Sequence, residues 1–133
     1  MEKVDLRGIG GKEKEIAKLY PELKRESGPL HDFVDLKTGQ RYEMKKTANP
    51  KLQSWIDPTK YVNLSEDDRN IVFRFVHYDK DTGDFIRHYD TTLGKVVDRF
   101  CPNKVLEAAR YMNSLYPKRS QFQFKLNVVW LNE

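Results

Sequence analysis

The sequence has few of the residues that build cysteine-based sites or membrane anchors. Cys101 is the only cysteine among 133 residues, so neither an internal disulfide nor a cysteine-based zinc site can form. No apolar run approaches the roughly 20 residues that a membrane-spanning helix needs. The opening MEKVDLRGIG also lacks the hydrophobic segment of a signal peptide. We therefore expect a cytoplasmic, intracellular protein with no membrane partner.

The composition is that of a folded and slightly basic domain. Hydrophobic residues make up 38% of the chain and aromatic residues 12%, which is too many for a disordered segment. The 24 Lys and Arg residues outnumber the 20 Asp and Glu residues, giving a net charge of +4. This balance is compatible with a nucleic-acid partner but does not require one. The length, without repeats or linkers, predicts one domain over residues 1–133.

Hydrophobic periodicity predicts helix, hairpin, hairpin, helix and strand in that order. Apolar residues recur at helical spacing between residues 16 and 23, and Pro21 either ends this helix near residues 19–20 or begins a further turn. We expect residues 48–68 to be irregular, with a helix cap at Ser65. The later elements are a hairpin with arms at 70–78 and 84–92, a helix at 103–115 and a strand at 121–132. This order predicts an α/β (α+β) fold with a mixed central sheet flanked by helices.

The first hairpin, HDFVDLKTGQRYEMKK, carries an unusual pattern of charge. A two-residue turn at 38–39 would pair Asp32 with Lys45, and Val34 with Glu43. Because opposite residues share a face, and residues two apart share it too, Asp32, Glu43 and Lys45 converge on one face.

The position of the turn decides which aspartate joins this face. A three-residue loop would shift the register by one and bring Asp35, instead of Asp32, onto the face of Glu43. The spacing of the residues leaves both alternatives open.

Two carboxylates and a lysine on one face suit metal-dependent hydrolysis of a phosphodiester. Neighbouring carboxylates repel each other, and Mg²⁺, or Mn²⁺ in its place, removes the conflict. The metal polarises a phosphate and acidifies the attacking water, while a lysine orients that water or stabilises developing charge. The spacing alone is equally compatible with a solvated strand, because Glu-x-Lys is frequent by chance.

The order Asp32, an apolar strand, then Glu43-Met44-Lys45 resembles the core hairpin of the PD-(D/E)xK nuclease superfamily. That superfamily includes many restriction endonucleases and the archaeal Holliday-junction resolvases. The resemblance implies a restriction-endonuclease-like fold and a Mg²⁺-dependent DNA endonuclease. It further implies that Asp32 and Glu43 bind the metal, with the Met44 carbonyl as a further ligand, and that Lys45 assists the water.

Two details of the resemblance bear on the choice of aspartate. A small restriction enzyme of this superfamily has a second aspartate three residues after the catalytic one, which favours Asp32 over Asp35. The proline of the family name is displaced here, since Pro29 lies three residues before Asp32.

Members of the superfamily often add a glutamate from a helix that precedes the hairpin. Resolvases of the family have a glycine four residues before that glutamate, and Gly11 would select Glu15. Glu13 and Glu22 remain alternatives, and both Glu13 and Glu15 are also typical of exposed helix charges.

Polar residues that follow the second arm of the hairpin are candidates for DNA contacts, or else belong to an ordinary polar loop. The candidates are Lys46, Thr47, Asn49, Lys51, Gln53 and Lys60. Cutting both strands of a duplex is simplest for a homodimer. We expect a type II restriction-like, site-specific enzyme, with a structure-selective resolvase and a non-catalytic basic nucleic-acid-binding module as the alternatives.

Overall fold

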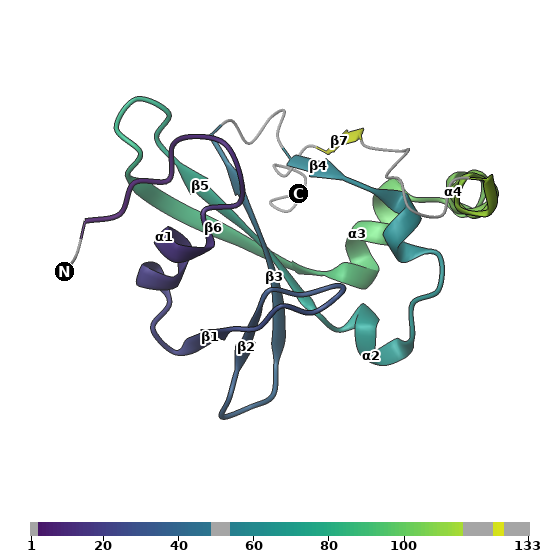
Figure 1. Ribbon diagram of the computed structural model, residues 1–133, viewed down its shortest axis with the longest axis horizontal. Coiled ribbons are helices and arrows are strands. Elements are labelled where there is room, and N and C mark those ends of the chain that lie inside the picture. The colour runs from purple at the N-terminus through teal and green to yellow at the C-terminus, as the bar shows by residue number, and fades with distance from the viewer. Residues whose placement is uncertain (1–2, 49–53, 116–123, 127–133) are drawn as a thin grey trace.

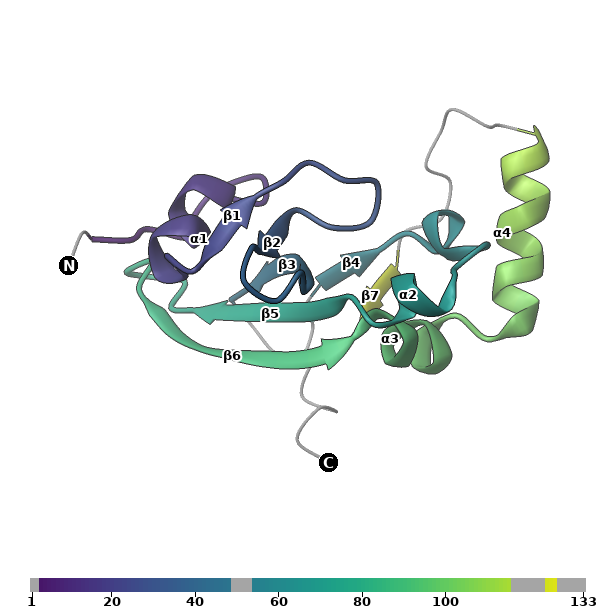
Figure 2. The same ribbon diagram turned by 90° about the horizontal axis from the view of Figure 1, so that it is seen from below.

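The computed structural model describes residues 3–48, 54–115 and 124–126, and its centre is a mixed five-stranded sheet (Figures 1 and 2). Across the sheet the strands are β1 (Leu23–Arg25), β2 (Phe33–Asp35), β3 (Arg41–Thr47), β5 (Val72–Tyr78) and β6 (Phe85–Thr92). β3 and β5 run parallel, and the other neighbours run antiparallel. Two further short strands, β4 (Ser54–Ile56) and β7 (Phe124–Leu126), pair with each other.

The described residues form four α-helices and one 3₁₀ helix beside the sheet. They are α1 (Glu13–Leu19), η1 (Pro58–Tyr61), α2 (Glu66–Arg69), α3 (Leu93–Phe100) and α4 (Asn103–Leu115). The prediction of an α/β protein with a mixed central sheet and flanking helices is confirmed. Within the described residues, no helix combines the length and the apolar character needed to cross a membrane.

Different helices cover the two faces of the sheet. On one face Phe75 of β5 belongs to an apolar cluster with Val96 of α3. On the other face Met44 and Val76 lie in a cluster with Ile16 of α1. Because side chains alternate along a strand, the two neighbours of Met44 on β3 point away from α1, toward the first face.

The predicted elements are largely present, with corrections at the first helix. α1 ends at Leu19, so of the two alternatives at Pro21 the one that ends the helix holds. Leu23 lies in β1, a short strand that the periodicity did not predict. β5, β6 and α4 confirm the second hairpin and the second helix. In the last predicted strand only residues 124–126 are described, and they form β7.

Two other segments differ from the predictions. Residues 57–69 are more regular than expected, with η1 and α2, and the predicted Ser65 cap is confirmed by its bond to the Asp68 N–H at 3.0 Å. α3 was not predicted at all. Gly94 and two valines lower its helix propensity, but its apolar side chains are buried on β5 and Thr92 caps its first turn.

Candidate active site

The turn of the charged hairpin is longer than predicted. Phe33 lies opposite Tyr42, so the two-residue turn at 38–39 is wrong and the predicted pairing of Asp32 with Lys45 is wrong by two positions. A slip of two residues leaves every side chain on its predicted face, because side-chain direction along a strand has a period of two. The three residues of the predicted site therefore keep their shared face.

The side chain of Asp35 explains the longer turn. Its Oδ1 accepts hydrogen bonds from the backbone N–H of Lys37 at 2.8 Å and of Thr38 at 3.3 Å. Its carbonyl accepts from the N–H of Gly39 at 2.7 Å, and Gly39 has a positive φ of 77°. These local bonds hold a loop in place of the two-residue turn. Asp35 thus serves the turn, and Asp32 is the aspartate beside Glu43.

Asp32 is bound to the strand that carries the other two residues. Its Oδ1 accepts a hydrogen bond from the backbone N–H of Met44 at 3.1 Å. Burial and then the nearby charge of Glu43 raise the pKa of Asp32 from 3.8 to about 7. Two carboxylates that share a partly buried place cannot both ionise without cost.

Glu43 and Lys45 lie two residues apart on β3 and on one face of it. Burial raises the pKa of Glu43, while the positive charges of Lys45 and Lys60 oppose that rise. The Lys45 Nζ is 3.8 Å from Glu43 Oε1. The predicted trio is therefore assembled as one group of two carboxylates with an ammonium beside them.

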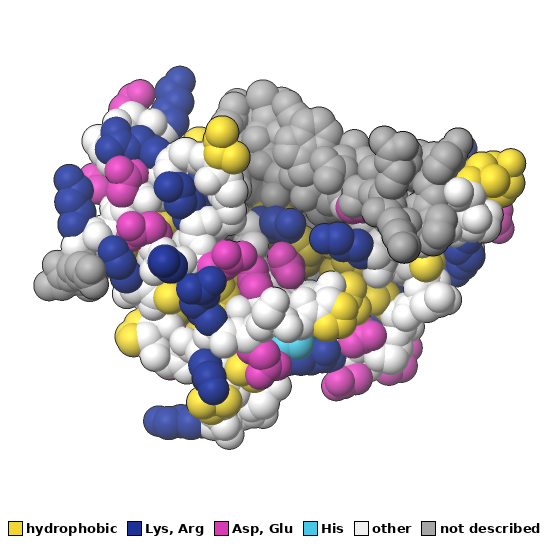
Figure 3. All heavy atoms as spheres, in the orientation of Figure 1, with side chains coloured by type: hydrophobic (Ala, Val, Ile, Leu, Met, Phe, Trp, Pro, Cys, Tyr) yellow, Lys and Arg dark blue, Asp and Glu magenta, His cyan; other side chains and the backbone are white. Residues whose placement is uncertain are grey.

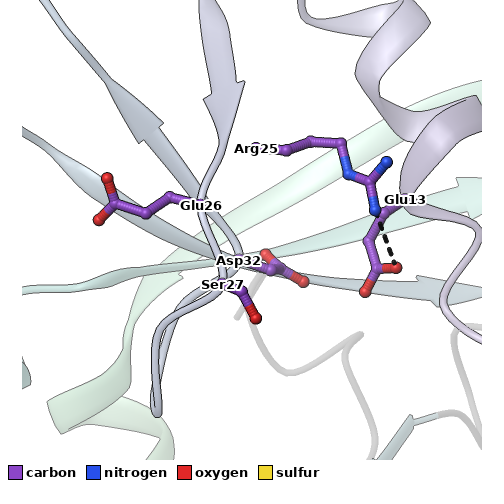
Figure 4. Close-up of a pocket in the computed structure, with 5 residues that line it drawn as sticks. All are labelled: Glu13, Arg25, Glu26, Ser27 and Asp32. Atoms are coloured by element: carbon purple, nitrogen blue, oxygen red, sulfur yellow. Dashed lines mark ion pairs between the residues drawn. The ribbon is translucent and has the colours of Figure 1, made fainter.

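Glu13 is the glutamate of the first helix whose charge acts on both Asp32 and Glu43. It lines a cavity of about 280 Å³ together with Asp32, Arg25, Glu26 and Ser27 (Figure 4). Its charge contributes to the raised pKa of Asp32.

The other two helix glutamates have different neighbours. The carboxylate of Glu15, the residue that the glycine spacing selected, forms an ion pair with Lys18 at 2.9 Å. Glu22 is exposed, and its charge acts on the pKa of Tyr20. Of the three alternatives, the structure thus brings Glu13 to the cavity that Asp32 lines.

The available side chains suit Mg²⁺ better than a metal ion that is enclosed by protein ligands alone. Among the described residues, no three Asp, Glu, His or Cys side chains are grouped closely enough to enclose a metal. Mg²⁺ is usually held by one or two carboxylates, with waters and substrate phosphates completing its shell. Asp32 and Glu43 meet that requirement. The predicted role of the Met44 carbonyl stays a prediction.

The predicted DNA contacts are scattered around the structure. Lys46 points to the face opposite Glu43, where its ammonium donates to the Leu6 carbonyl at 2.9 Å and to the Gly8 carbonyl. Thr47 is buried, and Lys60 is exposed on η1 near Glu43. Three candidates lie outside the described residues: Asn49, Lys51 and Gln53. Alternation from the apolar Met44 was the available signal that Lys46 faces elsewhere.

One residue near the site went unnoticed in the sequence, and the residue that follows it contacts the histidine that precedes Asp32. Arg25 lines the cavity beside Asp32, and its Nη2 is 3.8 Å from Glu13 Oε2. The buried His31 bonds to Glu26 at 2.8 Å. Arg25 lies on β1, which periodicity did not reveal, so no local pattern pointed to it.

The surface around the site has charges of both signs. Figure 3 shows acidic side chains gathered near the middle of one face, with Lys and Arg side chains to either side. Basic groups around an acidic centre suit a polyanion whose reacting phosphate lies over a metal ion.

Comparison with known families finds no family model that matches the chain, and no curated protein matches it.

Proposed function

We propose that the chain is a Mg²⁺-dependent DNA endonuclease with a restriction-endonuclease-like fold. The observation that carries the proposal is the Asp32–Glu43 pair, two partly buried carboxylates with raised pKa values and Lys45 beside them. Holding two like charges together lowers stability unless a cation joins them. A solvated strand face would not bury this pair, so the pair favours a metal site over plain surface charge.

Each residue of the site would have a separate role in hydrolysis. Asp32 and Glu43 would hold the ion, and the Met44 N–H fixes the Asp32 carboxylate in place. Bound Mg²⁺ supplies positive charge that polarises the phosphate and acidifies the attacking water. The Lys45 ammonium donates hydrogen bonds to that water or to the phosphate oxygens as negative charge builds on them. Lys60 adds a second positive charge near Glu43.

A site-specific, type II restriction-like enzyme is the target class that the hairpin resemblance supports. Such an enzyme would act as a homodimer, because each subunit then cuts one strand of a two-fold duplex. Sedimentation with and without DNA measures this directly. A protein that stays monomeric in both conditions while cutting both strands at one site would refute the dimer.

Supercoiled plasmid tests the proposed reaction. We expect nicking or linearisation with Mg²⁺ or Mn²⁺ and none with chelator. Lys45→Ala should abolish cutting and leave DNA binding largely intact. Asp35→Asn is the matched control, because it changes the other aspartate of the same hairpin.

The outcomes separate the candidate functions. Cutting of plain duplex at one short sequence supports restriction, and cutting of a four-way junction regardless of sequence supports a resolvase. Binding without any cutting in either metal would show a non-catalytic nucleic-acid-binding module and end the nuclease proposal.

A further inference from the structure

We propose that the ion pair between Glu13 and Arg25 couples nucleic-acid binding to metal binding, an inference that rests on the nuclease function proposed above. In the free protein Glu13 pairs with Arg25. When the nucleic acid binds, one of its backbone phosphates replaces Glu13 as the ion-pair partner of Arg25. The Glu13 carboxylate then joins Asp32 and Glu43 as a third ligand for the metal.

The pair is a loose and accessible one. Arg25 Nη2 and Glu13 Oε2 are 3.8 Å apart, and the two side chains are 49% and 44% exposed. That separation exceeds the length of a charged hydrogen bond. An exposed pair of this kind contributes little stability, so exchanging its partner has a low energetic cost.

The Glu13–Arg25 pair lies between Asp32 and two lysines at the start of α1, Lys12 and Lys14. The cavity beside Asp32 and a second hollow of about 350 Å³ share Glu13 and Arg25 as lining residues. The second hollow is also lined by Lys12, Lys14 and Glu15, and the Glu15 carboxylate is paired with Lys18. A polyanion crossing from those lysines to Asp32 therefore passes Arg25. Figure 4 shows Arg25 reaching from β1 to Glu13 beside Asp32.

Phosphate is a better partner for Arg25 than the present one. A planar guanidinium binds phosphate oxygens through two parallel hydrogen bonds. The single 3.8 Å contact with Glu13 does not use that geometry.

An unpaired Glu13 carboxylate would be unfavourable beside Asp32 and Glu43 in the metal-free protein. Its negative charge already acts on both Asp32 and Glu43. A third carboxylate at the centre would add repulsion in the absence of metal. Arg25 offsets that charge in the free protein, and the metal ion would offset it in the complex. Each ligand therefore removes part of the cost of binding the other, and by linkage the effect is reciprocal.

A titration of the protein with Ca²⁺, measured by calorimetry, tests the coupling without any turnover, since Ca²⁺ binds the same oxygen ligands as Mg²⁺. For the wild type we expect a short duplex to tighten Ca²⁺ binding by about tenfold. Arg25→Gln should bind Ca²⁺ more tightly than the wild type without DNA, gain nothing from DNA, and bind DNA more weakly. Glu13→Gln should lose the coupling as well.

Two further variants serve as controls. Lys24→Gln removes a positive charge from the adjacent position of β1, where Lys24 lies opposite Val34 and, unlike Arg25, lines neither hollow. It should keep the full coupling. Arg25→Lys retains the charge without the bidentate geometry and should keep only part of it. Thermal melts confirm that each variant is folded.

Failure of the coupling differs from failure of the nuclease proposal. If the wild type cuts DNA but Ca²⁺ binds equally well with and without duplex, or Arg25→Gln behaves like Lys24→Gln, the coupling is refuted and the nuclease stands. If the wild type neither binds nor cuts DNA, both proposals fall.

Discussion

The backbone N–H of Met44 donates to the carboxylate of Asp32 at 3.1 Å. This bond ties the aspartate of one strand to the residue that separates Glu43 from Lys45 on the next. The acidic pair is therefore positioned by the main chain, and its mutual repulsion is built into the folded state. That repulsion gives the site a measurable signature in stability.

Asp32→Asn is expected to stabilise the metal-free protein above about pH 7, by up to about 4 kcal/mol. The folded pKa of Asp32 is raised from 3.8 to about 7, so the unfolded chain releases this proton first as the pH rises. The free energy of unfolding of the wild type should thus fall between about pH 4 and about pH 7. Urea denaturation in chelator measures the profile, and parallel profiles for the two proteins would contradict the prediction.

Mg²⁺ should reverse the difference in stability between the wild type and Asp32→Asn. At alkaline pH the ion is expected to raise the melting temperature of the wild type, because it neutralises the ionised pair. Asp32→Asn removes one of the two ligands, so its melting temperature should hardly respond. An equal Mg²⁺ response in both proteins would place the ion elsewhere.

Replacing Lys46 by Ala and replacing Lys45 by Ala are expected to have different effects on stability and on DNA cutting. Lys46→Ala removes donors to the carbonyls of Leu6 and Gly8 and should cost about 1–3 kcal/mol of stability. Because its ammonium lies on the other face, the salt dependence of DNA binding should stay unchanged. Lys45→Ala should abolish cutting, and any loss of stability should come from the removed charge that offsets the Glu43 carboxylate. Reduced DNA binding at unchanged stability in Lys46→Ala would restore Lys46 as a DNA contact.

Asp35→Ala is expected to lower stability by about 1 kcal/mol and to retain cleavage. Its carboxylate accepts two backbone N–H groups in the turn, whereas Asp32 stands beside Glu43. Denaturation and plasmid cutting on the same preparation check both halves of the prediction. Loss of cutting with intact stability would transfer the ligand role to Asp35.

Two glycines with similar backbone angles should respond unequally to alanine. Gly39 has a φ of 77° in open space, so Gly39→Ala should cost about 1 kcal/mol from backbone strain. Gly83 has a φ of 79°, and a Cβ there would overlap the Asp5 carboxylate that Arg7 holds. Gly83→Ala should cost clearly more, and adding Asp5→Ala should recover part of the difference. Equal costs at the two sites would contradict the overlap.

The charged hairpin was predictable in part. The Asp32, Glu43 and Lys45 spacing, combined with the two-residue period of strands, gave the correct shared face even though the register was wrong. The turn itself was not predictable from turn preferences, because the Asp35 side chain bonds to the backbone of the loop. Such side-chain bonds compete with the tight turn that Gly39 alone suggests.

The strands and helices show the same division. β5 and β6 were evident because their apolar and aromatic residues favour strands. α3 was missed because its valines and Gly94 are poor helix formers, and burial against β5 outweighs that preference. β1 spans only Leu23–Arg25, too short for a period to appear.

The sequence by itself determined the chemistry proposed for this protein, since residue types and spacing along one hairpin specify two carboxylates and a lysine. Only the tertiary structure decided the surroundings. It placed Glu13 and Arg25 at the cavity beside Asp32, and it turned Lys46 toward Leu6. These partners are far apart in the chain, and their approach depends on how α1, β1 and the sheet pack together. Local spacing encodes which side chains share a face, whereas packing between distant segments decides what each face meets.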